Sequence, residues 1–242
     1  AALRVAGVMW FSPGLGSERI PPQVRVLAGL ALAVVVVPVA VTRPLVPAGA
    51  EEFITLCLAE LAFGAALGMT LSLLLEAFRF GGEVLDLQAG LRAGQLFDPG
   101  SGEASGLLST GYSLLALFLF LQLNGHHLLL RAMAASFQMT PVGALSAQPG
   151  LPEVICDVGR SMLTIGLTVA APVMGALLLA DLALGLVARA VPQVNVFLVG
   201  LPAKIALGLA IAAAGAPLLG PQVRALVAES ARYLDLVVRA CG

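Results

Sequence analysis

The stretch LVARAVPQVNVFLVGLPAKIALG, residues 186–208, decides the architecture of the second half of the chain. Four polar or charged residues stand in it between two long apolar runs: Arg189, Gln193, Asn195 and Lys204. Pro192 is expected to end a helix because it lacks an N–H and its ring clashes with the preceding turn. Asn195 is a favourable N-cap for the next helix. The stretch therefore predicts a helical hairpin with a polar tip that faces protein, water or a partner.

Two charges lie at matching distances from the middle of this turn. Asp181 precedes Gln193 by twelve residues, and Lys204, the only lysine of the chain, follows it by eleven. On antiparallel helices these positions have a similar depth, and a charge left alone in an apolar layer is expensive. The spacing predicts that Asp181 and Lys204 face the same layer and pair. The alternative is that each meets a different subunit.

The composition is that of a membrane protein. Of the 242 residues, 59% are hydrophobic and 11% are charged, whereas a soluble domain carries about 25% charged residues. We expect an all-α, multi-helix integral membrane protein with broken, kinked helices, because helices satisfy their own backbone groups in lipid. The net charge of −1 and the absence of a basic run give no sign of nucleic-acid binding.

Five apolar runs are candidates for membrane spans: 26–41, 53–75, 107–123, 162–188 and 196–219. If all five crossed a bilayer in alternation, six arginines would lie on each side, so the positive-inside rule gives no orientation. The 27 glycines and 15 prolines favour close helix packing, since broken helices persist in membranes where neighbouring helices satisfy the freed backbone groups. The pattern fits a subunit of a tightly packed assembly better than a lone permease.

Charged residues occur in the second run and just after it. Glu60 has no partner nearby in the sequence. Beyond it, Glu76, Arg79, Glu83 and Asp86 follow at spacings of three, four and three, which places them on one helical face if two adjacent glycines do not break the helix. We expect this face and Glu60 to contact neighbouring subunits, with exposure to water as the alternative for the face.

Two breaks divide the chain. FDPGSGEASG, residues 97–106, is rich in glycine and lacks periodicity, so it is expected to be a loop. TPVGALSAQPGLPE, residues 140–153, separates a longer first part from a shorter second part. Apolar and charged residues mix over 222–239 as in an amphipathic helix. We therefore expect three segments, which are 1–140, 154–220 and 221–242.

Catalytic and metal-binding patterns give little support for an enzyme. His126 and His127 are adjacent, so on a helix their side chains point about 100° apart and do not readily share a metal. The sequence holds no GxSxG, HExxH, Walker A or GxGxxG motif. The three cysteines are far apart, which favours free thiols. We expect no catalytic residue, no metal and no cofactor, and a structural or interfacial role for the two histidines.

Five ordered blocks resemble the FliR/SctT family of type III secretion export-apparatus proteins. They are RVAGVMWFSPGLGSERIPPQVRVLAGLAL, then Glu60 with GAALG, then DLQAGL to DPGSG, then FLQLNGHHLLL through SFQMTPVG, and finally ARAVPQVNVFLVGLPAKIALGL. NGHH and SFQMTPVG are closer to the flagellar branch of the family than to the injectisome branch. Family members usually have a further segment before the RVAG block, whereas residues 1–3 precede it here.

The resemblance implies a structural subunit of the flagellar type III export gate in the bacterial inner membrane, within the flagellar basal body. Such a subunit would form a channel with FliP and FliQ, contact FlhB and membrane lipid, and pass unfolded flagellar proteins without being an enzyme. It implies a FliP-like first part followed by a FliQ-like helical hairpin. It also implies helices that climb out of the membrane plane, which would explain the balanced arginine count.

The resemblance also assigns residues to two functional regions. A plug loop in the pore would consist of Phe97, Asp98, Pro99, Gly100, Ser101, Gly102 and Glu103. The hairpin tip at the entrance to the channel would consist of Arg189, Pro192, Gln193, Asn195 and Phe197.

Two other classes of function remain as alternatives. A small-molecule or ion carrier would use Glu60, Asp181 and Lys204 as buried charges, although no internal repeat of the kind that carriers often show is evident. An intramembrane enzyme would use His126 and His127 but lacks partner residues.

Overall fold

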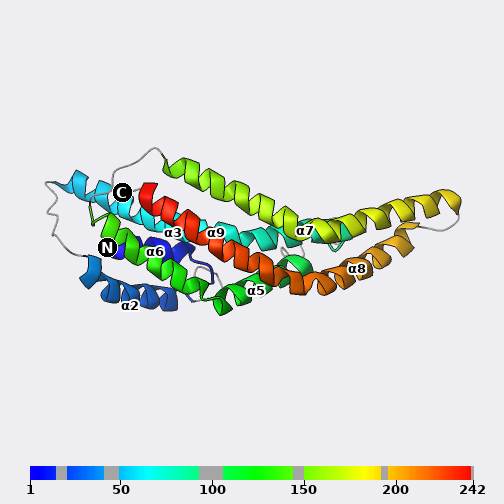
Figure 1. Ribbon diagram of the computed structural model, residues 1–242, viewed down its shortest axis with the longest axis horizontal. Helices are drawn as coiled ribbons and strands as arrows, with labels where there is room; N and C mark the ends of the chain where they lie inside the picture. The colour runs from blue at the N-terminus through cyan, green and yellow to red at the C-terminus, as the bar shows by residue number, and fades with distance from the viewer. Residues whose placement is uncertain (15–20, 41–48, 93–105, 144–149, 192–195, 241–242) are drawn as a thin grey trace. The chain divides into compact units, whose positions relative to one another are not determined.

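The computed structural model describes residues 1–14, 21–40, 49–92, 106–143, 150–191 and 196–240, and every regular element in this part of the chain is a helix. The helices, labelled in Figure 1, are α1 (Ala2–Phe11), α2 (Pro22–Ala40), α3 (Ala50–Ala89), α5 (Leu107–Gln122), α6 (Gly125–Met139), α7 (Leu151–Ala190), α8 (Val196–Gly215), the 3₁₀ turn η1 (Ala216–Leu218) and α9 (Leu219–Ala240). The predicted all-α class is confirmed.

Local sequence signals explain several helix ends. Helix α2 starts with Pro22 in its first turn, where the missing N–H is not needed. Helix α3 has Glu51 and Glu52 in its first turn, where the helix dipole favours acidic side chains. It ends at Ala89, and the glycine that follows, Gly90, has a left-handed φ of 79°, as is common just after a helix end. Helix α7 ends at Ala190, two residues before Pro192, as the sequence predicts.

The adjacent glycines of α3 do not break the helix. A side-chain carbon on Gly81 would lie 2.7 Å from the backbone oxygen of Gly166 in α7, and one on Gly82 would lie 2.4 Å from the Cα of Ser109 in α5. Both distances are too short for a side chain. The two glycines therefore allow close packing of α3 against α7 and α5, and α3 continues to Ala89.

In the part of the chain that the structure describes, not all of the five apolar runs become helices long enough to cross a membrane. Among the described residues, three helical stretches are long and apolar enough to cross a membrane: Ala50–Ala89, Leu151–Ala190 and Val199–Ala240. Helices α5 and α6 would make a fourth as a pair bent by 65°. Helix α2 continues through Pro38 to Ala40, and its stretch Pro22–Val35 is among the shorter apolar helices.

The longest helices exceed the thickness of a bilayer. Helices α3 and α7 each have 40 residues, which corresponds to about 60 Å at about 1.5 Å per residue. The hydrocarbon core of a bilayer is about 30 Å thick. Part of each helix must therefore lie in the headgroup region, in water or against protein.

The chain forms two compact units, neither of which is one continuous segment. The first unit consists of residues 1–75, 120–161 and 224–242, and the second of residues 76–119 and 162–223. The division into segments 1–140, 154–220 and 221–242 is a different one. It rests on breaks in the sequence and on likeness to other proteins, and it stays a prediction.

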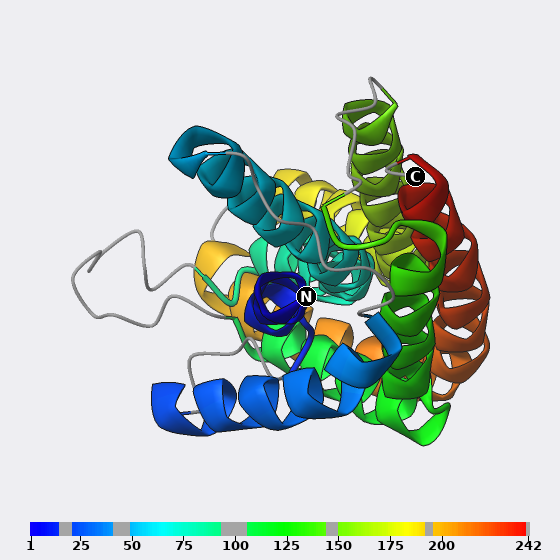
Figure 2. The same cartoon turned by 90° about the vertical axis from the view of Figure 1, so that its left-hand side faces the viewer.

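In the first unit, α1 lies among the other helices and is seen nearly end-on in Figure 2. It approaches α3 at small residues: a side-chain carbon on Gly64 would lie 2.0 Å from the backbone oxygen of Arg4, and one on Gly7 would lie 2.5 Å from that of Leu61. Only glycine permits such an approach between two helix backbones. Helix α1 is therefore an internal element of this unit, with Val5 and Val8 in its core.

In the second unit, α7 and α8 lie side by side as an antiparallel pair (Figure 1). Gly208 of α8 packs against Ala89 and Leu177, and Gly200 packs against Leu184. Helices α7 and α8 continue through Pro172 and Pro202. This is the helical hairpin that the opening stretch of the sequence predicts.

Candidate functional site

A buried ion pair joins α1 to α3 in the first unit. The guanidinium of Arg4 donates to both carboxylate oxygens of Glu60, from Nε to Oε2 and from Nη2 to Oε1, at 2.9 Å each. The side chains of Arg4 and Glu60 are 0% and 5% exposed. A two-pronged contact of this kind is the strongest geometry for an arginine and a carboxylate.

The remaining polar atoms of this pair also have partners within the unit. Nη1 of Arg4 donates to the backbone oxygens of Ser136 and Thr140 at 3.0 and 3.2 Å, and the N–H of Gly143 donates to Oε1 of Glu60 at 3.2 Å. The rings of Phe63 and Phe137 lie on the guanidinium, 4.7 and 4.3 Å from its central carbon. The pair therefore fastens α1, α3, the end of α6 and the turn after it.

A second buried carboxylate, that of Asp86, holds the start of α5 in the second unit. Its Oδ1 and Oδ2 accept the N–H groups of Leu108 and Ser109 at 2.9 Å each. Its backbone oxygen accepts the N–H of Leu91 at 3.0 Å. A side-chain carbon on Gly106 would lie 1.8 Å from Oδ2 of Asp86, so glycine is required there. Asp86 thus bonds to the chain on both sides of residues 93–105.

The predicted charged face of α3 is only partly a surface. Arg79 forms ion pairs with Glu76 at 3.0 Å and with Glu83 at 3.4 Å, and all three side chains are partly exposed. Asp86 and Glu60, by contrast, are buried among groups of their own chain. Contact with a neighbouring subunit stays a prediction for the residues named for it: Glu60, Glu76, Arg79, Glu83, Asp86, His126 and His127.

The hairpin of the second unit holds the other ion pair. Nζ of Lys204 lies 2.7 Å from Oδ1 of Asp181, and the two side chains are 18% and 44% exposed. This is the pair that the spacing around Gln193 predicts. At the tip, Arg189 is exposed at the end of α7 and Phe197 lies in α8. Pro192, Gln193 and Asn195 lie outside the described residues, as do all seven residues predicted for the plug loop, Phe97 to Glu103.

Several apolar side chains on α7 are not covered by any other part of the chain that the structure describes. Leu179, Leu182 and Leu186 are 68%, 66% and 70% exposed. In the most apolar windows of the membrane-length helices, 28% of the residues are buried for α7 and 17% for Val199–Ala240, against 56% for α3. These two stretches therefore need lipid or other protein to cover them.

The NGHH block forms the turn between α5 and α6. Asn124 adopts a left-handed φ of 57°, which asparagine tolerates better than most residues, and α6 starts at Gly125. His126 and His127 are exposed, with ring centroids 4.2 Å apart. Among the described residues, no three His, Cys, Asp or Glu side chains gather as a metal site would require.

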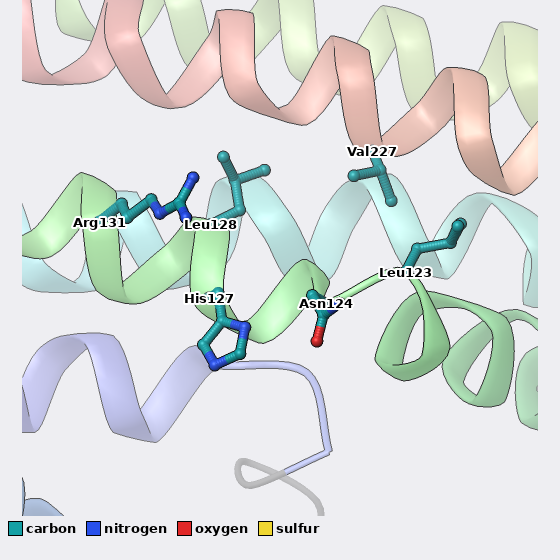
Figure 3. Close-up of a pocket in the computed structure, with 6 residues that line it drawn as sticks. All are labelled: Leu123, Asn124, His127, Leu128, Arg131 and Val227. Carbon is teal, nitrogen blue, oxygen red and sulfur yellow. The ribbon is translucent and has the colours of Figure 1, made fainter.

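A pocket of about 350 Å³ opens beside this turn (Figure 3). It is lined by Leu123, Asn124, His127, Leu128 and Arg131 from the turn and α6, and by Val227 from α9. The sequence alone gives no sign of this pocket, because Val227 is about a hundred residues away from the NGHH block.

Comparison with known proteins gives one consistent result. The model of the family described as bacterial export proteins, family 1, matches residues 1–230. The flagellar biosynthetic protein FliR of Aquifex aeolicus is 33% identical over 216 residues, which is 89% of this chain and 83% of that protein. FliR of Escherichia coli is 31% identical over 94% of this chain and 87% of its own. FliR of Bacillus subtilis is 37% identical over 64% of this chain and 61% of its own.

Proposed function

The chain belongs to family 1 of the bacterial export proteins and is a membrane-embedded component of the flagellar export apparatus, and we propose that it is a structural subunit of the flagellar type III export gate. In this role it forms a channel with FliP and FliQ in the bacterial inner membrane and contacts FlhB. Unfolded flagellar proteins pass through that channel. The subunit shapes the passage and carries out no enzymatic reaction.

The observation that carries the proposal is the exposure of long apolar helices in a chain that matches an export family from residue 1 to residue 230. Helix α7 is about 60 Å long, and most of its apolar surface is uncovered. Lipid covers about 30 Å of such a helix. The rest is covered most readily by further helices, which FliP and FliQ would supply.

The loop and the hairpin tip have complementary roles in this proposal. Residues 97–103 act as the plug of the channel. Asp86 accepts hydrogen bonds from Leu91 before this loop and from Leu108 and Ser109 after it, so it holds the two ends of the loop together. The tip around residues 189–197 borders the cytoplasmic entrance. Residues 1–140 form a FliP-like part, and residues 154–220 form a FliQ-like hairpin.

The arrangement of buried charges does not favour a carrier. Glu60 is enclosed by Arg4 and backbone groups, and Lys204 is paired with Asp181. A carrier that used these groups to bind a substrate would have to break both contacts.

Coexpression with FliP and FliQ, purification in a mild detergent and measurement of the mass of the intact complex test the proposal. We expect one complex that contains all three proteins. As a matched pair on α7, Leu182→Glu should reduce recovery of the complex, because it places a charge on the uncovered face. Arg160→Gln, which alters an exposed ion pair with Asp157, should leave recovery unchanged. Isolation of this chain only as a monomer or homodimer would refute the gate and support a carrier.

A further inference from the structure

The pocket beside the α5–α6 turn has one polar and one apolar side. Asn124, His127 and Arg131 supply polar groups, whereas Leu123, Leu128 and Val227 supply apolar surface. His127 and Arg131 are four residues apart on α6, so they lie on neighbouring turns of the same helix. Figure 3 shows Arg131, Leu128 and Leu123 on the side of the turn and α6 that faces Val227 of α9, whereas the ring of His127 and the amide of Asn124 point to the other side of α6. Such a two-sided lining matches a ligand that is itself amphipathic.

The polar side has an uncompensated positive charge. Arg131 is exposed and forms no ion pair with a carboxylate among the described residues. Some other exposed arginines are paired, as Arg79 is with Glu76 and Arg239 with Asp235, whereas Arg189, Arg224 and Arg232, like Arg131, form no ion pair with a carboxylate among the described residues. The pocket also lies at the start of α6, where the helix dipole is positive and the first N–H groups lack helical acceptors. The pocket is therefore suited to an anion.

The apolar side and the setting narrow the choice of anion. Helices α5 and α6 together have the length and hydropathy of a broken membrane span or a re-entrant loop, so we take lipid to be within reach of this turn. Arginine side chains in that setting seek phosphate groups at the interface. A volume of about 350 Å³ is at the small end of the range for ligand pockets, which suits a headgroup but not whole acyl chains.

We propose that this pocket binds the headgroup of an anionic phospholipid. The guanidinium of Arg131 donates hydrogen bonds to the phosphate, which is the pairing that arginine geometry favours. His127 and Asn124 also line the pocket. The first part of the acyl chains contacts Leu123, Leu128 and Val227. The proposal depends on the membrane setting of the chain and not on its place in an export gate.

Native mass spectrometry of the full chain, purified in a neutral detergent and stripped of lipid, tests the site. Three ligands are added separately: phosphatidylglycerol, phosphatidylcholine and inorganic phosphate. We expect phosphatidylglycerol to bind at least about tenfold more tightly than either of the others, because only it offers both a net negative headgroup and acyl chains. Equal binding of inorganic phosphate would show a site for free anions and overturn the lipid assignment.

Four variants separate the pocket from general charge attraction. Arg131→Gln should weaken binding of phosphatidylglycerol at least about tenfold, the effect of losing a hydrogen bond to a charged group, and Arg131→Lys should retain part of it. Val227→Phe should weaken binding without any change of charge, because it fills the pocket from α9. Arg239→Gln, on the exposed side of α9, should have no effect.

Each of these variants changes a side chain outside the buried core, so all four should unfold within a few degrees of the unaltered chain. Retention of full binding by both Arg131→Gln and Val227→Phe would overturn the proposal. An equal loss in Arg239→Gln and Arg131→Gln would also overturn it, because the attraction would then be a property of the surface and not of the pocket. In either case we would expect the ion-pair partner of Arg131 to be a carboxylate of a neighbouring subunit.

Discussion

The two units of the chain each contain an ion pair within apolar helices, and the two pairs are built differently. The Arg4–Glu60 pair of the first unit is buried, two-pronged and completed by Ser136, Thr140 and Gly143. The Lys204–Asp181 pair of the second unit has one contact, and the carboxylate side chain is 44% exposed. The first pair is saturated within the chain. The second keeps bonding capacity that water or another subunit can use.

The difference indicates which charges serve the fold and which remain available for function. A buried charge needs several partners because its desolvation is expensive, and its removal leaves the other charge without compensation. A partly exposed pair contributes little to stability, since water replaces the lost partner. We therefore assign the Arg4–Glu60 pair to the folding of the first unit and the Lys204–Asp181 pair to the interface of the hairpin.

The largest expected effect comes from breaking the buried pair. Arg4→Met should lower the free energy of unfolding by about 3–5 kcal/mol, because Glu60 would be left charged and buried. The measurement is denaturant-induced unfolding of the chain in detergent. The control is Arg160→Met, which removes an arginine that is 80% exposed and should change the free energy by less than about 1 kcal/mol. Equal stability of the two variants would show that the buried pair does not hold the unit together.

A slightly smaller effect is expected from separating α1 and α3 without touching a charge. Gly64→Ala should destabilise the chain by about 1–3 kcal/mol or more through overpacking, because the new carbon would meet the backbone of Arg4. Gly159→Ala in α7 is the matched control, since no atom lies within 4 Å of the added carbon. It should stabilise the helix by about 0.5–1 kcal/mol. If both variants behaved alike in thermal unfolding, the close approach of α1 and α3 would be refuted.

Loss of the Asp86 cap should have an intermediate effect. Asp86→Ala removes two hydrogen bonds to the start of α5 and leaves buried N–H groups unsatisfied, which costs about 1–3 kcal/mol. Asp86→Asn keeps one acceptor and should recover part of the loss. Hydrogen exchange at Leu108 and Ser109 is the site-specific readout. Unchanged protection of these two amides in Asp86→Ala would contradict the capping role.

The smallest effect on stability is expected at the hairpin. Lys204→Met should change the free energy of unfolding by less than about 1 kcal/mol, because the Asp181 side chain is 44% exposed and can find another partner. The same unfolding experiment measures it, with Arg4→Met as the reference. A loss as large as that of Arg4→Met would mean that the hairpin pair is also a folding element.

The sequence predicts the hairpin well because its information is local. Pro192 and the polar residues around it lie between two apolar runs, so the turn and the pairing of Asp181 with Lys204 follow from counting along two antiparallel helices. The all-α class follows in the same way from hydropathy. The local sequence leaves open whether Gly81 and Gly82 break α3. They do not, because these glycines allow close contact of α3 with α7 and α5.

The buried pair of the first unit could not be predicted, because 56 residues separate Arg4 from Glu60 and the two lie in different blocks of the sequence. The only signal is that each is a lone charge near an apolar run. Asp86 shows the same limitation: its spacing places it on the face of Glu76, Arg79 and Glu83, but packing against α5 buries it as a cap. The pocket beside His127 likewise needs α9, which the local sequence does not specify.

The most direct test of the distinction between the two pairs is the ratio of exported flagellar protein to folded chain in a bacterium that lacks its own FliR. Arg4→Met and Lys204→Met are compared with the unaltered chain, and both quantities are measured in the same cells. We expect Arg4→Met to lower the amount of folded chain and export together, so that the ratio stays constant. Lys204→Met should leave the amount of chain unchanged and lower the ratio. A constant ratio in Lys204→Met, or its loss of folded chain to the extent seen in Arg4→Met, would contradict the separation of folding from function.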